Sequence, residues 1–283
     1  MRGSPRPGEI KGRVPLPQSR EEPSAAGPRR NTPGSTANIR LAAGLLQNKK
    51  MEKGLIIETQ PLDVYGQMAA DEALCETLPA PYVLRFYNWK EPGITFGYSQ
   101  RRKAVQQAVD AAGCRITAVT RRPTGGGIVF HETDLTFSFI FPSPGAYFEP
   151  GKTYDRLHRA INAEYARLGV TFDLLNEKTR DYAVNDPVMN CFSKPVDKDI
   201  LYNGKKVLGG ALRKFGEHML YQASFQAPDA RANTAMHRNA VIKALGGEFG
   251  LQWEAAAMTA ETANKAAVIA GDKYRTPQWN ERI

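Results

Sequence analysis

At its most informative point the chain reads RRPTGGGIVFH, from Arg121 to His131. The run Arg115–Thr120 precedes it, and in Leu135–Phe141 large apolar residues occupy every second position, which is the period of a β-strand. Consecutive glycines between strands allow positive φ and a close approach of the backbone to a bound group. Exposed N–H groups in such a turn can bind a phosphate, carboxylate or carbonyl oxygen. The motif indicates a ligand-binding turn, whereas the glycines alone favour a flexible hairpin turn.

Strands and helices alternate irregularly on both sides of this motif. The predicted strands are Gly54–Thr59, Tyr82–Tyr87, Ile94–Tyr98, Arg115–Thr120, Leu135–Phe141, Val170–Leu175, Asp199–Tyr202, Lys206–Arg213 and His218–Phe225. The predicted helices are 64–78 capped by Asp63, Arg102–Ala112, a helix capped by Thr153 and ended by Gly169, Met236–Leu245, and Glu254–Ile269. This order predicts an α/β domain of the α+β kind, with a mixed central sheet flanked by helices. We place the domain at residues 51–283, with its C-terminal helices from about residue 231.

The first 50 residues differ in composition from the rest. They hold ten Lys or Arg against three acidic residues, which accounts for +7 of the net charge of +9. They also contain seven of the 19 prolines and no aromatic residue, a composition typical of disorder. Three explanations stay open: a solvated tail, a transit-like segment, or translation that begins at Met51. Because the remaining chain is nearly neutral, its charge gives no reason to expect nucleic-acid binding.

The cysteines are Cys75, Cys114 and Cys191, with no CxxC pair among them. This pattern argues against a disulfide framework and against a zinc site, so no metal is expected. It favours a reducing compartment, and we predict a cytoplasmic protein. No apolar run approaches the roughly 20 residues needed to cross a bilayer, so no membrane association is expected.

A second motif, NGKKVLGGA, extends from Asn203 to Ala211. Asn-Gly is the strongest two-residue hairpin signal, so a hairpin turn is predicted at Asn203-Gly204. Since side chains alternate across a strand, Lys205 and Lys206 point to opposite faces, and one of them can reach a site. The residue pattern by itself does not choose between the two lysines.

Cys191 lies in MNCF, near Lys194, Lys198, Lys205 and Lys206 in sequence. Nearby cations lower the pKa of a thiol and raise its thiolate fraction. On composition alone, a small buried hydrophobic residue remains the simpler interpretation of a cysteine.

The motifs together resemble the biotin/lipoate protein ligase family, on its lipoate branch. RRPTGGGIVFH followed by LTFS (Leu135–Ser138) is similar to the family signature, and YNWKEPGITFGYSQ (Tyr87–Gln100) resembles its strand-turn-strand segment. NGKKVLGGA resembles its lysine motif, and the match places the family's central lysine at Lys206. The resemblance implies a fold like that of class II aminoacyl-tRNA synthetases and biotin synthetases. Cys-Phe shortly before the lysine motif is a feature of one class of octanoyltransferases, which Cys191-Phe192 matches.

What the resemblance implies is an acyltransferase of protein lipoylation. An octanoyl or lipoyl group would pass from acyl carrier protein through a Cys191 thioester to a lysine of an apo lipoyl domain or of the glycine cleavage H protein, with no cofactor. The implied catalytic residues are Cys191 and Lys206. The implied substrate-binding residues are Arg122, Thr124, Gly125, Gly126, Gly127, His131, Gly209, Gly210 and Ala211. His131 is also a candidate for the base that deprotonates the amine.

Further expectations and alternatives follow from the same match. Phe130, Phe137 and Phe139 are either walls of an acyl tunnel or core aromatics. An acidic carrier protein would meet the basic residues Arg101, Arg102, Lys103, Arg121 and Arg122. One alternative is an ATP- and Mg-dependent lipoate ligase in which Arg122, Gly126 and Lys206 hold lipoyl-AMP. The other is a non-catalytic binding protein, because Gly210 stands where the family has Ser and Ala223 where it has Gly.

Overall fold

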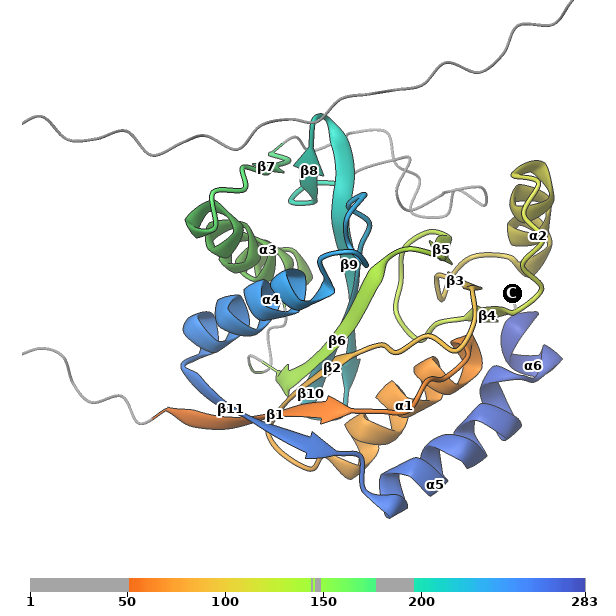
Figure 1. Cartoon of the computed structure of the whole chain (residues 1–283). Helices are drawn as coiled ribbons and strands as arrows, with labels where there is room; N and C mark the ends of the chain where they lie inside the picture. The colour runs from red at the N-terminus through yellow and green to blue at the C-terminus, as the bar shows by residue number, and fades with distance from the viewer. Residues whose placement is uncertain (1–50, 144, 146–148, 177–195, 283) are drawn as a thin grey trace, which may run out of the picture. The chain divides into compact units, whose positions relative to one another are not determined.

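The elements that position the motifs belong to two β-sheets with helices around them (Figure 1). The structure is a computed structural model that describes residues 51–143, 145, 149–176 and 196–282. The strands are β1 (Glu52–Glu58), β2 (Tyr82–Phe86), β3 (Gly93–Phe96), β4 (Val119–Arg121), β5 (Val129–His131), β6 (Leu135–Pro142), β7 (Asp173–Leu174), β8 (Ile200–Tyr202), β9 (Lys205–Phe215), β10 (His218–Phe225) and β11 (Leu251–Ala257). The helices are α1 (Val64–Thr77), α2 (Arg102–Ala111), α3 (Pro150–Arg167), α4 (Thr234–Phe249), α5 (Ala260–Ile269), the π-helical turn η1 (Ala270–Tyr274) and α6 (Pro277–Asn280).

The large sheet has the strand order β11-β1-β2-β6-β10-β9-β8-β7. Its first three strands run parallel, and from β2 to β8 each neighbouring pair is antiparallel. The Asn203-Gly204 turn joins β8 to β9, as predicted, and both residues have positive φ. The expected mixed sheet flanked by helices is confirmed.

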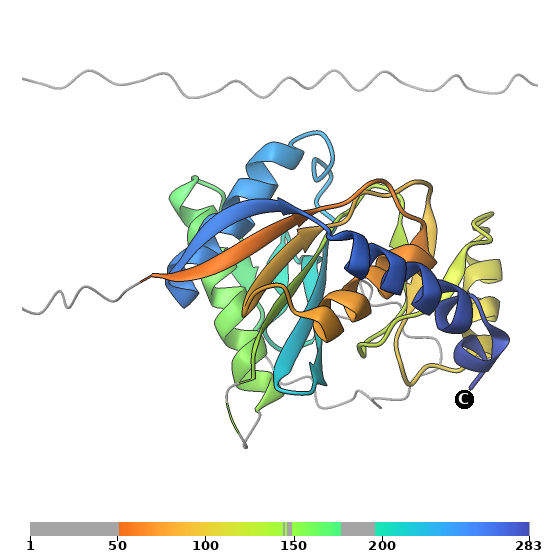
Figure 2. The same cartoon turned by 90° about the horizontal axis from the view of Figure 1, so that it is seen from below.

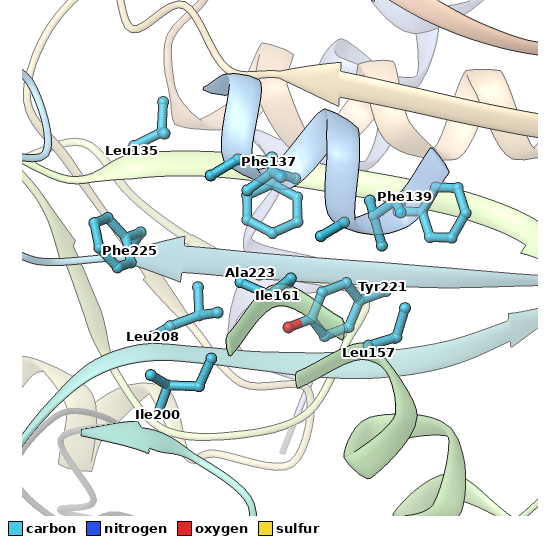
Figure 3. Packing of buried hydrophobic residues seen from close by; sticks show 14 of the residues in the cluster. Leu135, Phe137, Phe139, Leu157, Ile161, Ile200, Leu208, Tyr221, Ala223 and Phe225 are labelled. Carbon is cyan, nitrogen blue, oxygen red and sulfur yellow. The ribbon is translucent and has the colours of Figure 1, made fainter. Parts of the chain in front are cut away.

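Helices α3 and α4 cover one face of this sheet, and α1 and α5 cover the other (Figures 1 and 2). The core under α3 and α4 takes every second residue of β6 and β10 (Figure 3). Phe137, Phe139 and Tyr221 are fully buried in it, together with Leu157 and Ile161 of α3. Phe137 and Phe139 are therefore core aromatics and do not line an acyl tunnel.

The small sheet, in the order β4-β3-β5, packs with α2 around Ile94, Phe96 and Val105. Asp63 caps α1 as predicted, since its carboxylate accepts a hydrogen bond from the N–H of Gly66 at 2.8 Å. No helix among the described residues is long and apolar enough to cross a membrane.

Three of the secondary-structure predictions differ from the structure. The run Glu254–Ile269 is not one helix, because β11 ends at Ala257 and α5 begins at Ala260 behind the cap Thr259. β11 pairs in parallel with β1, where the Trp253 ring lies over Gly54, so tertiary pairing overrides the helix preference of its alanines. Thr153 is not a cap, because α3 begins at Pro150, which favours a first helical position. The strand expected at Arg115–Thr120 is reduced to β4.

Candidate active site

A small cavity opens between the two sheets, on the face of the large sheet opposite α3 and α4. It is lined by Met68, Tyr87, Thr95, Arg122, Val129, His131, Thr136, Gly209, Gly210, Ala211, Gln222, Ala223 and Ser224. Because side chains alternate along a strand, β10 sends Gln222 and Ser224 to the cavity while Tyr221 and Phe225 enter the core. The predicted substrate-binding residues Arg122, His131, Gly209, Gly210 and Ala211 thus come together in space.

The glycine-rich turn lies beside this cavity and is held in place. Thr124 is buried, and its hydroxyl donates to the side-chain oxygen of Gln222 at 2.7 Å. A Cβ on Gly97 would stand 1.8 Å from the carbonyl oxygen of Gly126, so the two backbones meet where no side chain fits. Gly126 has φ +88°, a conformation that favours glycine. The turn is a fixed structure, although Gly125–Gly127 are not among the residues that line the cavity.

The two arginines of the motif have different environments. The Arg122 guanidinium lines the cavity and donates to the carbonyl of Gly125 at 2.6 and 3.0 Å. Arg121 is fully buried, and its guanidinium donates to the carbonyls of Gln100 at 2.7 Å and Asn280 at 2.9 Å. Burial, and then the charge of Arg282, lowers the pKa of Arg121 to about 10. Neither residue belongs to an exposed basic patch, so the expectation that Arg121 and Arg122 meet an acidic carrier was wrong.

His131 is held from both sides of its ring. Nδ1 lies 2.8 Å from the Asp134 carboxylate, and Nε2 lies 2.9 Å from the Thr95 hydroxyl. The ring also stacks on Trp89 with centroids 4.4 Å apart. Burial tends to raise the pKa of Asp134, but the charge of His131 and hydrogen bonds from its neighbours lower it below its ordinary value. With both ring nitrogens engaged, His131 is suited to shaping the cavity and poorly placed to act as the base.

A buried polar network supports the cavity wall beyond His131. The Asp71 carboxylate accepts from Arg85 at 2.6 and 2.9 Å, from Ser138 at 2.6 Å and from Gln222 at 2.7 Å. Tyr87 donates to the same carboxylate. Arg85 and Asp71 are both fully buried, so these partners compensate the cost of burying the charges. This network was not predicted from the sequence, although a lone arginine inside the apolar strand YVLRFY was a signal for it.

The structure separates the two lysines of the second motif. Lys205 is exposed, whereas Lys206 is 6% exposed and its Nζ lies 2.8 Å from the Asp199 carboxylate. The Lys206 side chain crosses Gly209, where an added Cβ would stand 2.1 Å from its Cε. Gly209 itself lines the cavity. The absent side chain of Gly209 therefore provides the space that the end of the Lys206 side chain fills, next to a residue that lines the cavity.

A side chain at Gly210 would meet a steric conflict that the structure shows. A Cβ at this position would stand 2.3 Å from Cε2 of Tyr221. Tyr221 is fully buried, and its hydroxyl lies 2.6 Å from Nε2 of His158. The ring of Tyr221 thus occupies the space that a serine side chain would need, so Gly210 and Tyr221 form a matched pair.

The structure describes two of the three cysteines, Cys75 and Cys114. Cys191 lies outside the described residues. Cys75 is buried in α1, and burial, followed by the charges of Asp71 and Glu72, raises the pKa of its thiol. A thiol in that environment is a poor nucleophile. Within the described ranges, no group of three or more His, Cys, Asp or Glu residues could hold a metal ion.

Comparison with known sequences identifies what these motifs belong to. Residues 63–227 match the family described as lipoyl protein ligase A/B catalytic domain. An octanoyltransferase LipM of Oceanobacillus iheyensis is 31% identical over 173 residues, which cover 58% of this chain and 61% of that protein. A LipM of Halalkalibacterium halodurans is 28% identical over 279 residues, which cover 82% of this chain and 100% of that protein. The match spans only 57% and 54% of two further LipM proteins, from Carboxydothermus hydrogenoformans and Symbiobacterium thermophilum.

Solved structures agree on the fold. A T. acidophilum protein assigned as a lipoate protein ligase, solved with bound lipoic acid, has a TM-score of 0.66 at 20% identity and covers 82% of this chain and 100% of its own. A lipoate-protein ligase A bound with ATP has a TM-score of 0.65 at 21% identity, over 82% and 99%. At these identities the likeness shows the fold, which is the synthetase-like fold expected from the sequence.

Proposed function

Because the chain belongs to the lipoyl protein ligase A/B catalytic domain family, we propose that it is an octanoyltransferase of protein lipoylation. The expectation of an enzyme of this family agrees with its named relatives, octanoyltransferases and lipoate-protein ligases. The observation that carries the proposal is the position of Lys206, whose side chain crosses Gly209 at the edge of the cavity that the family motifs build.

In the first step, the Cys191 thiolate attacks the carbonyl carbon of an octanoyl thioester on acyl carrier protein. The new bond joins the Cys191 sulfur to the acyl carbon, and the carrier sulfur leaves as a thiolate that takes up a proton. This step consumes no ATP and needs no metal or cofactor. Its support is the Cys191-Phe192 pair, which stands before the lysine motif as in the cysteine-dependent class.

In the second step, the neutral amine of an acceptor lysine attacks the same acyl carbon. A C–N bond forms, the Cys191 thiolate leaves, and the proton of the amine passes to a base or to water. The Lys206 ammonium is suited to stabilise the oxyanion of each tetrahedral intermediate, and losing one such donor costs about 10²–10³ in rate. The acceptors would be an apo lipoyl domain or the glycine cleavage H protein, in the cytoplasm.

The cavity limits how the acyl chain can bind. Its volume of about 30 Å³ is enough for roughly one water molecule and too small for an eight-carbon chain. Met68 borders it, and its sulfur lies 3.5 Å from the Gln222 amide nitrogen. A thioether side chain with three rotatable bonds adapts more easily than the surrounding rings. We infer that the acyl chain enters by displacing Met68.

Intact-mass measurement after mixing the protein with octanoyl-carrier protein, without ATP, tests the proposal. The expected product is an octanoyl adduct that hydroxylamine removes, as it removes a thioester but not an amide. The Cys191→Ala variant should lack this adduct, whereas Cys75→Ala and Cys114→Ala should keep it. Transfer by Cys191→Ala that requires ATP and free acid would instead identify a ligase with lipoyl-AMP as intermediate. Binding of an acylated partner without any turnover would identify a non-catalytic protein.

A further inference from the structure

A cluster of buried polar groups lies behind Lys206, on the α3 side of the large sheet. It contains Asp199, which precedes β8, Tyr154 and His158 of α3, and Tyr221 of β10. The residues Asp199, His158 and Tyr221 are fully buried, Tyr154 is partly buried, and none of the four belongs to the family motifs quoted above. Burying polar groups is costly unless they are hydrogen-bonded, so the arrangement of their bonds is informative.

The Asp199 carboxylate is fixed in orientation by three groups. Oδ2 accepts from the backbone N–H of Val196 at 2.7 Å and lies 2.8 Å from Nζ of Lys206. Oδ1 accepts from the Tyr154 hydroxyl at 2.5 Å. The tyrosine therefore holds the oxygen that the lysine leaves available, and the carboxylate cannot rotate without breaking a bond.

The Tyr154 hydroxyl also connects α3 to the strand that carries the lysine. It accepts a hydrogen bond from the backbone N–H of Gly210 at 3.0 Å. Burial and then the Asp199 charge raise the pKa of Tyr154 well above its ordinary value, so its hydroxyl stays protonated and remains a donor. The Tyr154 hydroxyl oxygen thus links the Asp199 carboxylate, which binds Lys206, to the backbone N–H of Gly210.

The surrounding groups keep this geometry. The Tyr154 ring lies against His158 with centroids 4.0 Å apart. Burial, and then the Lys206 charge, lowers the pKa of His158 to about 3, so the imidazole stays neutral near pH 7. A neutral ring does not compete with Lys206 for the carboxylate.

We propose that Tyr154 is a positioning residue, which orients Asp199 so that the Lys206 ammonium stays at the edge of the cavity. The positioning role of Tyr154 rests on the proposed function only in its expected effect on the rate of acyl transfer. The geometric consequence is separate: a buried ammonium fixed by an oriented carboxylate exchanges its protons slowly and gives a resolved ¹⁵N-edited lysine signal, which Lys206→Arg would assign.

The test compares Tyr154→Phe with Tyr165→Phe. Tyr165 is a matched control, because it is on the same helix, is 1% exposed and bonds through its hydroxyl to His237 at 2.9 Å, away from Lys206. Tyr154→Phe should broaden or lose the Lys206 signal and lower kcat about tenfold or more, below the 10²–10³ expected for losing the lysine itself. KM for carrier and acceptor should stay within about twofold, since no substrate contact is removed. Tyr165→Phe should keep both the signal and the rate.

The outcomes are distinguishable. An unchanged Lys206 signal and an unchanged rate in a folded Tyr154→Phe protein overturn the proposal. Loss of the signal in a protein that transfers no acyl group even as wild type supports the positioning role and refutes the proposed function. If Tyr154→Phe does not fold, amide exchange of Gly210 carries the test. Exchange should be slow in the wild type and faster in Lys206→Ala, and equal exchange in the two proteins overturns the proposal.

Discussion

Replacing Gly210 by serine, the residue of the family motif, should destabilise this protein. An added Cβ would stand 2.3 Å from Cε2 and 2.6 Å from Cζ of Tyr221, well inside van der Waals contact. The Tyr221 ring has little freedom to move, because its hydroxyl bonds to His158 and the ring packs edge-to-face with Phe137 at a centroid distance of 6.0 Å. Overpacking of a buried site costs about 1–3 kcal/mol. At about 2–4 °C per kcal/mol for a domain of this size, Tm should fall by about 2–12 °C.

A double-mutant cycle with Tyr221→Ala isolates the steric conflict. Tyr221→Ala alone should cost about 3–5 kcal/mol, because it opens a cavity in the core. In Gly210→Ser/Tyr221→Ala the added side chain meets no ring, so the double variant should be more stable than the sum of the single effects predicts. We expect a coupling of about 1–3 kcal/mol, measured by denaturant unfolding.

Gly247 supplies the control for adding a side chain to a glycine. It lies in α4, where an added Cβ would meet no atom within 4 Å apart from the adjacent backbone of its own helix, so Gly247→Ser should leave Tm within a few degrees of wild type. A Gly210→Ser protein that melts like wild type, or single effects that add, would show that the fit of Gly210 against Tyr221 is not the reason for the glycine.

Three further predictions concern the site. In a transfer assay, Lys206→Ala should lower the rate of acyl transfer about 10²–10³-fold. Lys206→Arg should also fail, because a planar guanidinium does not replace a compact ammonium. Lys205 is exposed, so Lys205→Ala should retain the wild-type rate. The pKa of His158 is about 3 in the folded protein and about 6.5 in the unfolded chain, so between these pH values the unfolded chain binds the extra proton. The free energy of unfolding should therefore fall as the pH drops from about 6.5 toward 3, by up to about 1.4 kcal/mol per pH unit. Chemical denaturation at several pH values should show this slope, and a His158→Gln protein with an undiminished slope would assign it to other groups. Met68→Ala should enlarge the cavity and raise the rate with acyl groups longer than eight carbons relative to octanoyl; an unchanged preference in competition assays would place the acyl chain elsewhere.

Local signals in the sequence were sufficient for most of the secondary structure. The period of two in Leu135–Phe141 gave β6, and Asn203-Gly204 gave the hairpin between β8 and β9. Asp63 gave the start of α1 through its side-chain cap. These signals are reliable because they depend on neighbours in the chain. The prediction at β11 was wrong for the opposite reason: its alanines favour a helix, and only pairing with β1 makes this segment a strand.

The sequence also determined which motifs build the site, while the tertiary structure decided what each residue does there. Alternation shows that Lys205 and Lys206 face opposite ways, but the inward one is chosen by Asp199 and by the open space over Gly209. Arg121 and Arg122 are adjacent in the chain, yet one is bonded to the C-terminal segment at Asn280 and the other lines the cavity. Tyr154 carries no recognisable signal, because its role depends on a carboxylate 45 residues away. Periodicity is a property of the chain, whereas burial and partnership arise only when distant segments pack together.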